Sequence, residues 1–361
     1  MTRIVRVGFI PLMDAALLLV AAREGFAEEE GLALDLLRDV SWANLRDKLA
    51  LGFIDAAHML APAAVAASLG IGQIRVPLLA PMALNLNGNA ITVSLALHDV
   101  LAAEATGDLA DPVASATALR RVVGTRRAGG APPPTFGHVF PFSSHHYQLR
   151  AWMRAGGVDP DRDVNLVVLP PPYMARSLAS GLIDGFCVGA PWNSLAVAEG
   201  HGRILHTGTD IVEPCVEKVL AVRAGLDAEA PDTVERLVRA VAAAASWAAE
   251  PGNLDRLAAV LAGQDAVGVP QPMARAILTG EFRTGTGLRV GPQYLRLTPD
   301  ALPPWPDHAD WILRHMIQAG QLPGGADGCA EARAVFGLER YRRATGEPLQ
   351  VDPTPPGGIG A

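Results

Sequence analysis

Aromatic and amide side chains that could line a site for a small planar ligand occur in two stretches of the sequence. Trp42 in SWANLRDKL directly precedes an expected helix, and an indole ring there could cover the face of a flat ligand. Asn87 and Asn89 flank Gly88 in LNLNGNAITVS, where amide and backbone N–H groups could point into a cleft. Each feature also has a structural interpretation, because a tryptophan often packs between lobes and an Asn-Gly-Asn run often forms a turn.

Two adjacent histidines could contribute to an anion site. His145 and His146 in VFPFSSHHYQLRAWM lie near an expected helix start, where free N–H groups and the helix dipole favour an anion. Adjacent helical residues point about 100° apart, so at most one of the two faces a cleft. A capping or surface role is the alternative for either histidine.

A glycine and a lysine complete the set of candidate residues. Gly189 ends an expected strand in DGFCVGAPWNS, where the missing side chain would let a ligand approach the backbone. Lys218 in EPCVEKVLAV and Lys48 are the only lysines among 30 basic residues, so each of them merits an explanation. The alternative for Lys218 is a surface ion pair worth less than about 1 kcal/mol.

The signatures of common enzymes are absent from the sequence. It contains no G-x-G-x-x-G after the first expected strand, no phosphate-binding P-loop, no H-E-x-x-H and no G-x-S-x-G. We therefore expect no catalysis, no metal and no cofactor. The formal net charge of −7 argues against direct binding to nucleic acid. The three cysteines lack metal-type spacing, which fits a reducing compartment.

Strand and helix patterns alternate along most of the 361 residues, which predicts an α/β fold with parallel strands and helices on both sheet faces. We expect lobe I to comprise residues 1–92 and the return segment 206–345 with its C-terminal helices, and lobe II to comprise 93–205. Two crossings between the lobes would form a hinge beside a ligand cleft. Residues 99–134 are expected to form an irregular surface loop and 346–361 a disordered tail.

The individual elements follow from the periodicity of apolar residues. Strands are expected over 4–10, 32–37, 54–57, 164–169, 184–188, 203–207 and 218–222, and helices over 13–28, 43–51, 62–69 and 172–180, with two further helices beginning near 231 and 304.

The apolar run AALLLVAA at residues 15–22 raises the question of a secretion signal. Pro11 and Asp14 interrupt the apolar stretch, and Asp14 can cap a helix, so we assign the run to the fold. Its 8 residues fall far short of the roughly 20 that a membrane helix needs. We therefore expect a cytoplasmic protein without a membrane segment.

Seven stretches, taken together and in order, resemble the nitrate- and bicarbonate-binding proteins of bacterial ABC transporters. They are GFIPLMDAALLLVAAREGF, SWANLRDKL, IDAAHML, LNLNGNAIT, FPFSSHHYQLRAWMRAGGVDPDRDV, PPPYMARSLASGLIDGFCVGAPWN and EKVLAV. The resemblance implies the type II periplasmic-binding-protein fold, with two α/β lobes around a cleft. The segment 99–134 looks inserted relative to that family.

The resemblance also implies a ligand site, because the nitrate pocket of that family matches particular residues of this sequence. These residues are Trp42, Asn89 or its close alternative Asn87, His145, Gly189 and Lys218. Bicarbonate-binding relatives use carboxylate-assisted calcium at the lysine position, so Lys218 favours nitrate or nitrite without metal. Lys218→Ala and His145→Ala are expected to lose ligand binding without unfolding the protein.

The expected cytoplasmic start resembles the cytoplasmic nitrate and nitrite sensor of that family. This resemblance implies a partner, an antiterminator with a response-regulator-like domain and an RNA-binding ANTAR domain, which the sensor holds inactive and releases on ligand binding. The alternative is the substrate-binding component of a nitrate/nitrite ABC transporter. An enzyme similar to the thiamin-pyrimidine synthases is a third possibility, disfavoured because no cysteine-rich cluster occurs.

Overall fold

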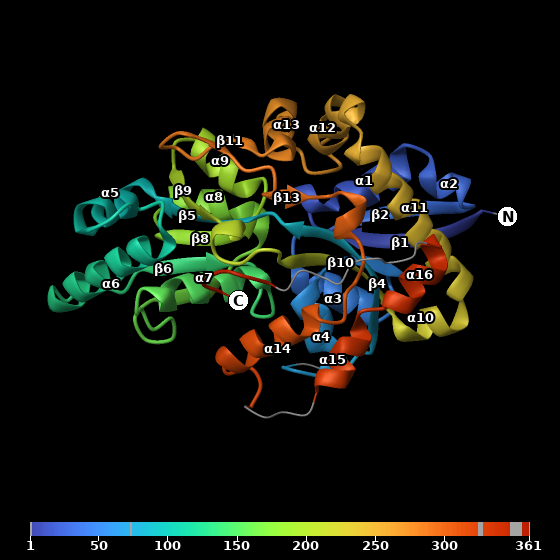
Figure 1. Ribbon diagram of the computed structural model, residues 1–361, viewed down its shortest axis with the longest axis horizontal. Helices are drawn as coiled ribbons and strands as arrows, with labels where there is room; N and C mark the ends of the chain where they lie inside the picture. Colours follow the sequence, from blue (N-terminus) through green and yellow to red (C-terminus); the bar gives the residue numbers. More distant parts are fainter. Residues whose placement is uncertain (1, 73, 324–327, 347–355, 361) are drawn as a thin grey trace.

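Two lobes, each built around its own β-sheet, make up the molecule (Figure 1). The computed structural model describes residues 2–72, 74–323, 328–346 and 356–360. The six-stranded sheet of lobe I has the order β13-β4-β10-β3-β1-β2, and the five-stranded sheet of lobe II has the order β7-β6-β8-β5-β9. Both sheets mix parallel and antiparallel pairs. The predicted α/β architecture with two lobes is confirmed.

The strands of lobe I are β1 (Arg3–Phe9), β2 (Leu32–Arg38), β3 (Ala56–Leu60), β4 (Leu78–Asn87), β10 (Val216–Arg223) and β13 (Leu295–Arg296). Those of lobe II are β5 (Asn89–Ser94), β6 (Thr135–His138), β7 (Asn165–Val168), β8 (Gly185–Gly189) and β9 (Gly202–Thr207). β11 (Glu281–Arg283) and β12 (Leu288–Val290) form a separate hairpin.

The helices of the first half of the chain are η1 (Met13–Ala15), α1 (Ala16–Arg23), α2 (Phe26–Glu29), α3 (Trp42–Ala50), α4 (Ala61–Leu69), α5 (Leu95–Glu104), α6 (Pro112–Ala128), α7 (Ser144–Ala155), η2 (Pro171–Tyr173), α8 (Met174–Ala179), α9 (Trp192–Ala198) and η3 (Gly208–Asp210). The remaining ones are α10 (Ala224–Glu229), α11 (Pro231–Ala249), η4 (Pro251–Asn253), α12 (Leu254–Ala262), α13 (Gln271–Thr279), η5 (Pro299–Ala301), α14 (His308–Gln318), α15 (Cys329–Val335) and α16 (Leu338–Thr345).

The apolar run near the N-terminus lies in the core of lobe I. Residues 16–21 of α1 are buried, and α1 packs against α11 on one face of the sheet. The single helix expected over 13–28 is instead divided into η1, α1 and α2. Gly25, at φ 90°, separates α1 from α2 because it adopts a left-handed conformation that side chains disfavour.

Residues 99–134 contain the end of α5 and the whole of α6 rather than the expected surface loop. Asp111 caps α6 by accepting a hydrogen bond from the N–H of Val113, and Pro112 occupies the first helical position. Leu119 and Val122 on the inner face of α6 are buried in the core of lobe II. The arginines of the run RRVVGTRRA hide this apolar face in the sequence, because they occupy the outer face of the same helix.

The chain crosses between the lobes twice, as the expected hinge requires. The first crossing is Gly88, between β4 and β5. Residues 89–92, which were assigned to lobe I, therefore pair within the sheet of lobe II. The second crossing follows β9 and η3, before β10. Residues 206 and 207, assigned to the return segment, still belong to β9 in lobe II.

Two C-terminal segments of the chain reach across to lobe II. In the β11–β12 hairpin, the carbonyl of Thr284 accepts a hydrogen bond from the N–H of Ile204, and Arg289 pairs with Asp210 at 2.6 Å. Residues 356–360 also pack against the body, since the Gly360 carbonyl accepts from Trp311 Nε1. The expected disordered tail is thus wrong for 356–360, and its part 347–355 lies outside the described residues.

Candidate functional site

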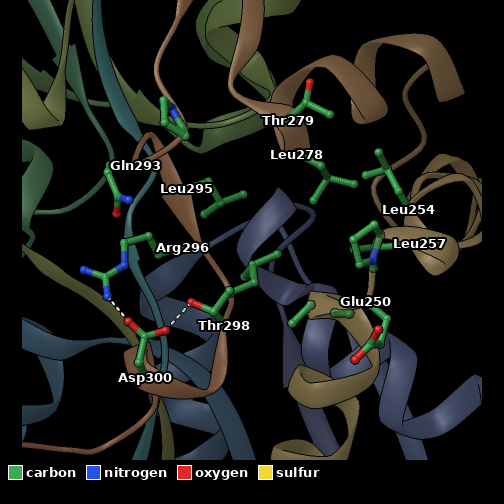
Figure 2. Close-up of a pocket in the computed structure, with 15 residues that line it drawn as sticks. Glu250, Leu254, Leu257, Leu278, Thr279, Gln293, Leu295, Arg296, Thr298 and Asp300 are labelled. Atoms are coloured by element: carbon green, nitrogen blue, oxygen red, sulfur yellow. Dashed lines mark hydrogen bonds and ion pairs between the residues drawn. The ribbon is translucent and has the colours of Figure 1, made fainter.

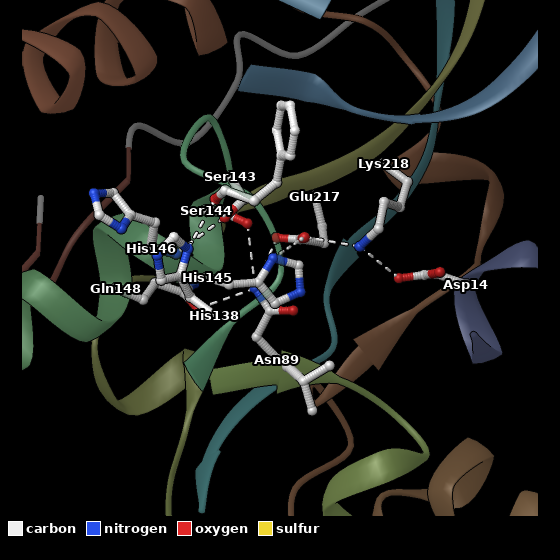
Figure 3. A network of polar contacts seen from close by, with 12 residues as sticks. Asp14, Asn89, His138, Ser143, Ser144, His145, His146, Gln148, Glu217 and Lys218 are labelled. Carbon is white, nitrogen blue, oxygen red and sulfur yellow. Dashed lines mark hydrogen bonds and ion pairs between the residues drawn. The ribbon is translucent and has the colours of Figure 1, made fainter. Parts of the chain in front are cut away.

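A lysine ammonium lies completely enclosed between the two lobes. Lys218 on β10 has a side-chain exposure of 0% and is paired with two carboxylates (Figure 3). Its Nζ lies 2.9 Å from Asp14 Oδ2 and 2.7 Å from Glu217 Oε1. Burial alone would lower the pKa of Lys218, but the two carboxylates outweigh it and raise that pKa, so the ammonium is charged.

An irregularity in β10 brings the neighbouring side chains of Glu217 and Lys218 to one place. Val216 is paired with Leu86 of β4 and Lys218 with Asn85, so Glu217 has no opposite residue there. Successive residues of a regular strand point to opposite faces, whereas an extra residue in one strand bends it and redirects its side chains. The register shift therefore explains how consecutive residues contact each other through their charged ends.

Asp14, which the sequence suggested as a helix cap, belongs to this cluster. Its Oδ1 lies 2.8 Å from His58 Nε2, and His58 Nδ1 accepts the N–H of Ile10 at 3.4 Å. Because Nδ1 is an acceptor, the neutral ring carries its proton on Nε2, toward Asp14. Burial would raise the pKa of Asp14, but Lys218 and His58 outweigh it and hold that pKa well below its usual range.

Side chains of lobe II lie against the carboxylate of Glu217. Asn89 on β5 donates from Nδ2 to Glu217 Oε2 at 2.7 Å, and Gln148 Oε1 and Ser144 Oγ lie 3.1 and 3.2 Å from the same nitrogen. His145 Nδ1, in the first turn of α7, lies 3.2 Å from Glu217 Oε1. Glu217 therefore links the two lobes in a network that is buried throughout.

His145 is neutral in this environment. Burial lowers the pKa of its imidazole well below the usual value, and the nearby Lys218 charge lowers it further. Neither of its ring nitrogens has a hydrogen-bond partner among the described residues, although Nδ1 lies 3.2 Å from Glu217 Oε1. Such an unsatisfied buried nitrogen is costly unless a ligand or water contacts it, so it marks a place where the cluster can accept another molecule.

Trp42 and Gly189 border the cluster. The ammonium of Lys218 lies 5.6 Å from the ring centroid of Trp42, and the indole Nε1 has no partner among the described residues. Gly189 is opposite Asn89 in the β5–β8 pair. A Cβ built on Gly189 would lie 3.4 Å from Leu12 and 3.7 Å from the Asp14 carboxylate, so its absence leaves that side of the cluster accessible to the backbone.

The structure brings together five of the six candidate residues, namely Trp42, Asn89, His145, Gly189 and Lys218. Asn87 is the exception. Its Oδ1 accepts from the N–H of Cys215 and its Nδ2 donates to the carbonyl of Gln293, so the side chain ties the hinge crossings together. Its φ of 63° at the crossing explains the choice of an asparagine there.

Several members of the cluster were not predicted from the sequence. They are Asp14, His58, Ser144, Gln148 and Glu217. Only Glu217 had a usable signal, its position beside one of two lysines. His146, by contrast, faces away and packs against His138 with ring centroids 4.5 Å apart, so one histidine of the pair faces the cleft, as expected.

A separate cavity in lobe I has no part in this cluster. It has a volume of about 450 Å³, and Figure 2 shows it between the end of α11, α12, the end of α13 and the segment around β13. Asp300 pairs with Arg296 and accepts from Thr298 at its rim. None of the candidate site residues lines this cavity.

The two lobes and the enclosed polar cluster define the class of protein, and a known structure supports it. The crystal structure of the periplasmic nitrate-binding protein NrtA from Synechocystis PCC 6803 matches with a TM-score of 0.86 at 27% identity, over 96% of this chain and 89% of that chain. The chain therefore has the α/β periplasmic-binding-protein fold. A family model described as the NMT1-like family matches residues 2–262, and the chain belongs to this family.

Curated relatives agree with this assignment. A nitrate/nitrite binding protein NrtA from Synechococcus elongatus is 30% identical over 351 residues, 94% of this chain and 77% of the relative. A bicarbonate transport ATP-binding protein CmpC from Synechocystis is 31% identical over 328 residues, 88% of this chain but 46% of that longer protein. The chain is thus a homologue of ABC-transporter substrate-binding proteins, and, in line with the prediction of no catalysis, these homologues are binding proteins rather than enzymes.

No helix in the described part of the chain has both the length and the apolar character required to cross a bilayer.

Proposed function

We propose that the chain binds nitrate or nitrite between its lobes and acts as the substrate-binding component of an ABC transporter. The observation that carries the proposal is the enclosed ammonium of Lys218. The Asn89 amide and the His145 imidazole of the other lobe lie beside it, against the Glu217 carboxylate that it contacts. A planar monoanion needs a positive charge, in-plane donors and an apolar ring at its side. Lys218 supplies the charge, Asn89 and His145 supply the donors, and Trp42 supplies the ring.

The geometry also accounts for closure of the lobes on the ligand. The cation comes from lobe I and the neutral donors come from lobe II, so an anion that contacts both sets stabilises the closed form over the open one. Each charge-assisted hydrogen bond contributes roughly 1.5 to 3 kcal/mol. Three or four such bonds, less the cost of anion desolvation, correspond to micromolar binding, about −8 kcal/mol.

Calorimetric titration tests the proposal. Nitrate and nitrite are expected to bind, and bicarbonate with calcium is expected not to, because the Lys218 ammonium already lies between the Asp14 and Glu217 carboxylates that a divalent cation would need as ligands. Binding of bicarbonate only, or of no anion, would overturn the proposal. Bicarbonate is a necessary comparison, since bicarbonate transport proteins are among the relatives.

Two matched variants focus the test on one residue. Lys218→Met removes the enclosed charge, whereas Lys48→Met removes the other lysine, which is 45% exposed and pairs with the buried Asp39 at 2.6 Å. We expect Lys48→Met to bind the anion like the parent and Lys218→Met to lose binding.

The cytoplasmic sensor predicted from the sequence is the second candidate. The relatives' names support the transport receptor instead, because they describe binding and transport proteins. The sensor would use the same closure, since a ligand that stabilises one lobe arrangement changes affinity for any partner that distinguishes the two. Gel filtration with an ANTAR-domain antiterminator decides: a complex that nitrate dissociates supports the sensor, and no complex supports the receptor.

A further inference from the structure

The carboxylate of Glu217 occupies the N–H donors that an incoming anion would need. Its two oxygens accept hydrogen bonds from Lys218 Nζ at 2.7 Å and Asn89 Nδ2 at 2.7 Å. His145 Nδ1 lies 3.2 Å from Glu217 Oε1 without a hydrogen bond. An ionised carboxylate only accepts hydrogen bonds, as nitrate and nitrite do. Glu217 is therefore an internal competitor of the ligand for the same donors.

The charges of the enclosed cluster lead to the same conclusion. Lys218 carries one positive charge, while Asp14 and Glu217 carry two negative charges when ionised, and each of these side chains is at most 3% exposed. An added monoanion would leave two negative charges in excess in a site closed to water. Uncompensated buried charge is so costly that ionisable groups change protonation state instead.

We propose that the anion enters this cluster together with one proton from solvent, and that the proton is held by Glu217. This inference rests on the proposed anion binding. A protonated carboxyl frees its share of the donors and gains an O–H group that can itself donate to the anion. Binding thus becomes neutral overall, with the ligand's charge cancelled by the proton taken up.

Glu217 is the best acceptor for this proton among its neighbours. Burial already raises the pKa of its carboxyl, with Lys218 opposing. Asp14 is held ionised by Lys218 and His58. Burial keeps the imidazoles of His58 and His145 neutral. It also keeps the thiols of Cys187 and Cys215 protonated. The titratable groups that interact with Glu217 are Asp14, His145, Cys187, Cys215 and Lys218, and His58 lies beyond Asp14.

The sign of the pH dependence follows from this linkage. The bound anion raises the pKa of Glu217 further, so the complex holds the proton at pH values where the free protein has released it. Affinity is then highest at low pH. As pH rises, the Kd increases about tenfold per pH unit while one proton accompanies each anion.

The test is nitrate calorimetry between pH 6 and 8 in PIPES, HEPES and imidazole, whose ionisation enthalpies differ. The dependence of the observed heat on buffer gives the number of protons taken up, which we expect to be close to one per anion at pH 7. Nitrate binding with no proton uptake would overturn the inference and leave the proposed function intact. No binding of nitrate or nitrite at any pH would instead refute the proposed function.

Variants locate the proton. Glu217→Gln resembles the protonated carboxyl, so it is expected to bind nitrate without proton uptake and with a Kd independent of pH. The control Glu229→Gln makes the same change at an exposed position of lobe I and should behave like the parent. Uptake that persists in Glu217→Gln would place the proton on another group of the cluster and overturn the assignment. If Glu217→Gln does not fold, the buffer series on the parent still decides whether a proton is taken up.

Discussion

Glu217 and Lys218 are consecutive residues of one strand, yet their charged ends meet at 2.7 Å inside the molecule. The register shift in β10 makes this contact possible, because Glu217 has no opposite residue in β4. The ammonium is therefore not an exposed charge waiting for an anion. It is part of a carboxylate–ammonium–carboxylate chain with Asp14, and this changes what its removal should do.

Lys218→Met should reduce stability as well as ligand binding. Without the ammonium, Asp14 and Glu217 remain buried as unpaired carboxylates, a loss of about 3 to 5 kcal/mol at neutral pH. Urea unfolding at pH 7 measures this loss of stability. Lys48→Met should cost less, about 1 kcal/mol, because Lys48 is 45% exposed and the Asp39 carboxylate keeps its hydrogen bonds from the N–H groups of Val40 and Ser41. This result would replace the sequence-based expectation that loss of Lys218 spares the fold, and an unaltered unfolding midpoint would restore that expectation.

Asn87 and Asn89 should separate stability from affinity. Asn87→Ala removes both hinge hydrogen bonds at a positive φ, which should cost about 1 to 3 kcal/mol of stability. It removes no N–H donor from the cluster, so nitrate affinity of the folded protein should be retained. Asn89→Ala removes a donor from the site and should weaken nitrate binding about tenfold or more. Calorimetry and urea unfolding of both variants check the assignment, and equal affinity losses would contradict it.

Local periodicity was sufficient to predict much of the fold. β1, β2 and α3 lie within a residue or two of their expected ranges because each has a regular apolar face. Local periodicity failed to predict α6, where a glycine and four arginines within RRVVGTRRA conceal the buried face. Charged residues on the solvent side of a helix carry no information about its inner side.

The candidate site shows a different limit. Trp42, His145 and Lys218 were found because rare residue types at strand or helix ends stand out in a sequence. Asp14 and Glu217 were not found. A carboxylate beside a helix start usually caps the helix, and a carboxylate beside a lysine usually forms a surface pair. Their roles depend on the register shift in β10 and on contact between segments about 200 residues apart, which local patterns do not encode.

The β11–β12 hairpin should act as an additional tie between the lobes. Arg289 of the hairpin pairs with Asp210 of lobe II, and the two side chains are 32% and 22% exposed. Arg289→Gln should favour the open form modestly and raise the nitrate Kd about threefold, as expected for loss of a partly exposed pair worth under about 1 kcal/mol.

The matched control for this tie is Arg275→Gln, which breaks an exposed pair with Asp255 between α12 and α13, within lobe I. It should leave the Kd unchanged. Small-angle scattering of the ligand-free proteins should show a larger radius of gyration for Arg289→Gln alone. Equal behaviour of the two variants would mean that the hairpin does not restrain lobe closure.

Buried neutral histidines should make the protein sensitive to mild acid. Burial lowers the pKa of His206 and of His308 to about 4, against 6.5 in an unfolded chain. Because the unfolded state takes up the proton first, stability is complete above pH 6.5 and falls until about pH 4, by about 3 kcal/mol for each histidine. Urea unfolding between pH 7 and 4.5 should show this decline.

One of these histidines allows a direct check. His308 packs against Phe336, and its Nε2 has no partner among the described residues, so His308→Leu removes a titrating group without breaking a hydrogen bond at that nitrogen. The variant should lose stability less steeply than the parent between pH 6.5 and 4.5. His201→Leu, at an exposed position, should follow the parent, because its imidazole contacts solvent in both states. Parallel pH profiles for parent and His308→Leu would show that this histidine is not a source of the acid sensitivity.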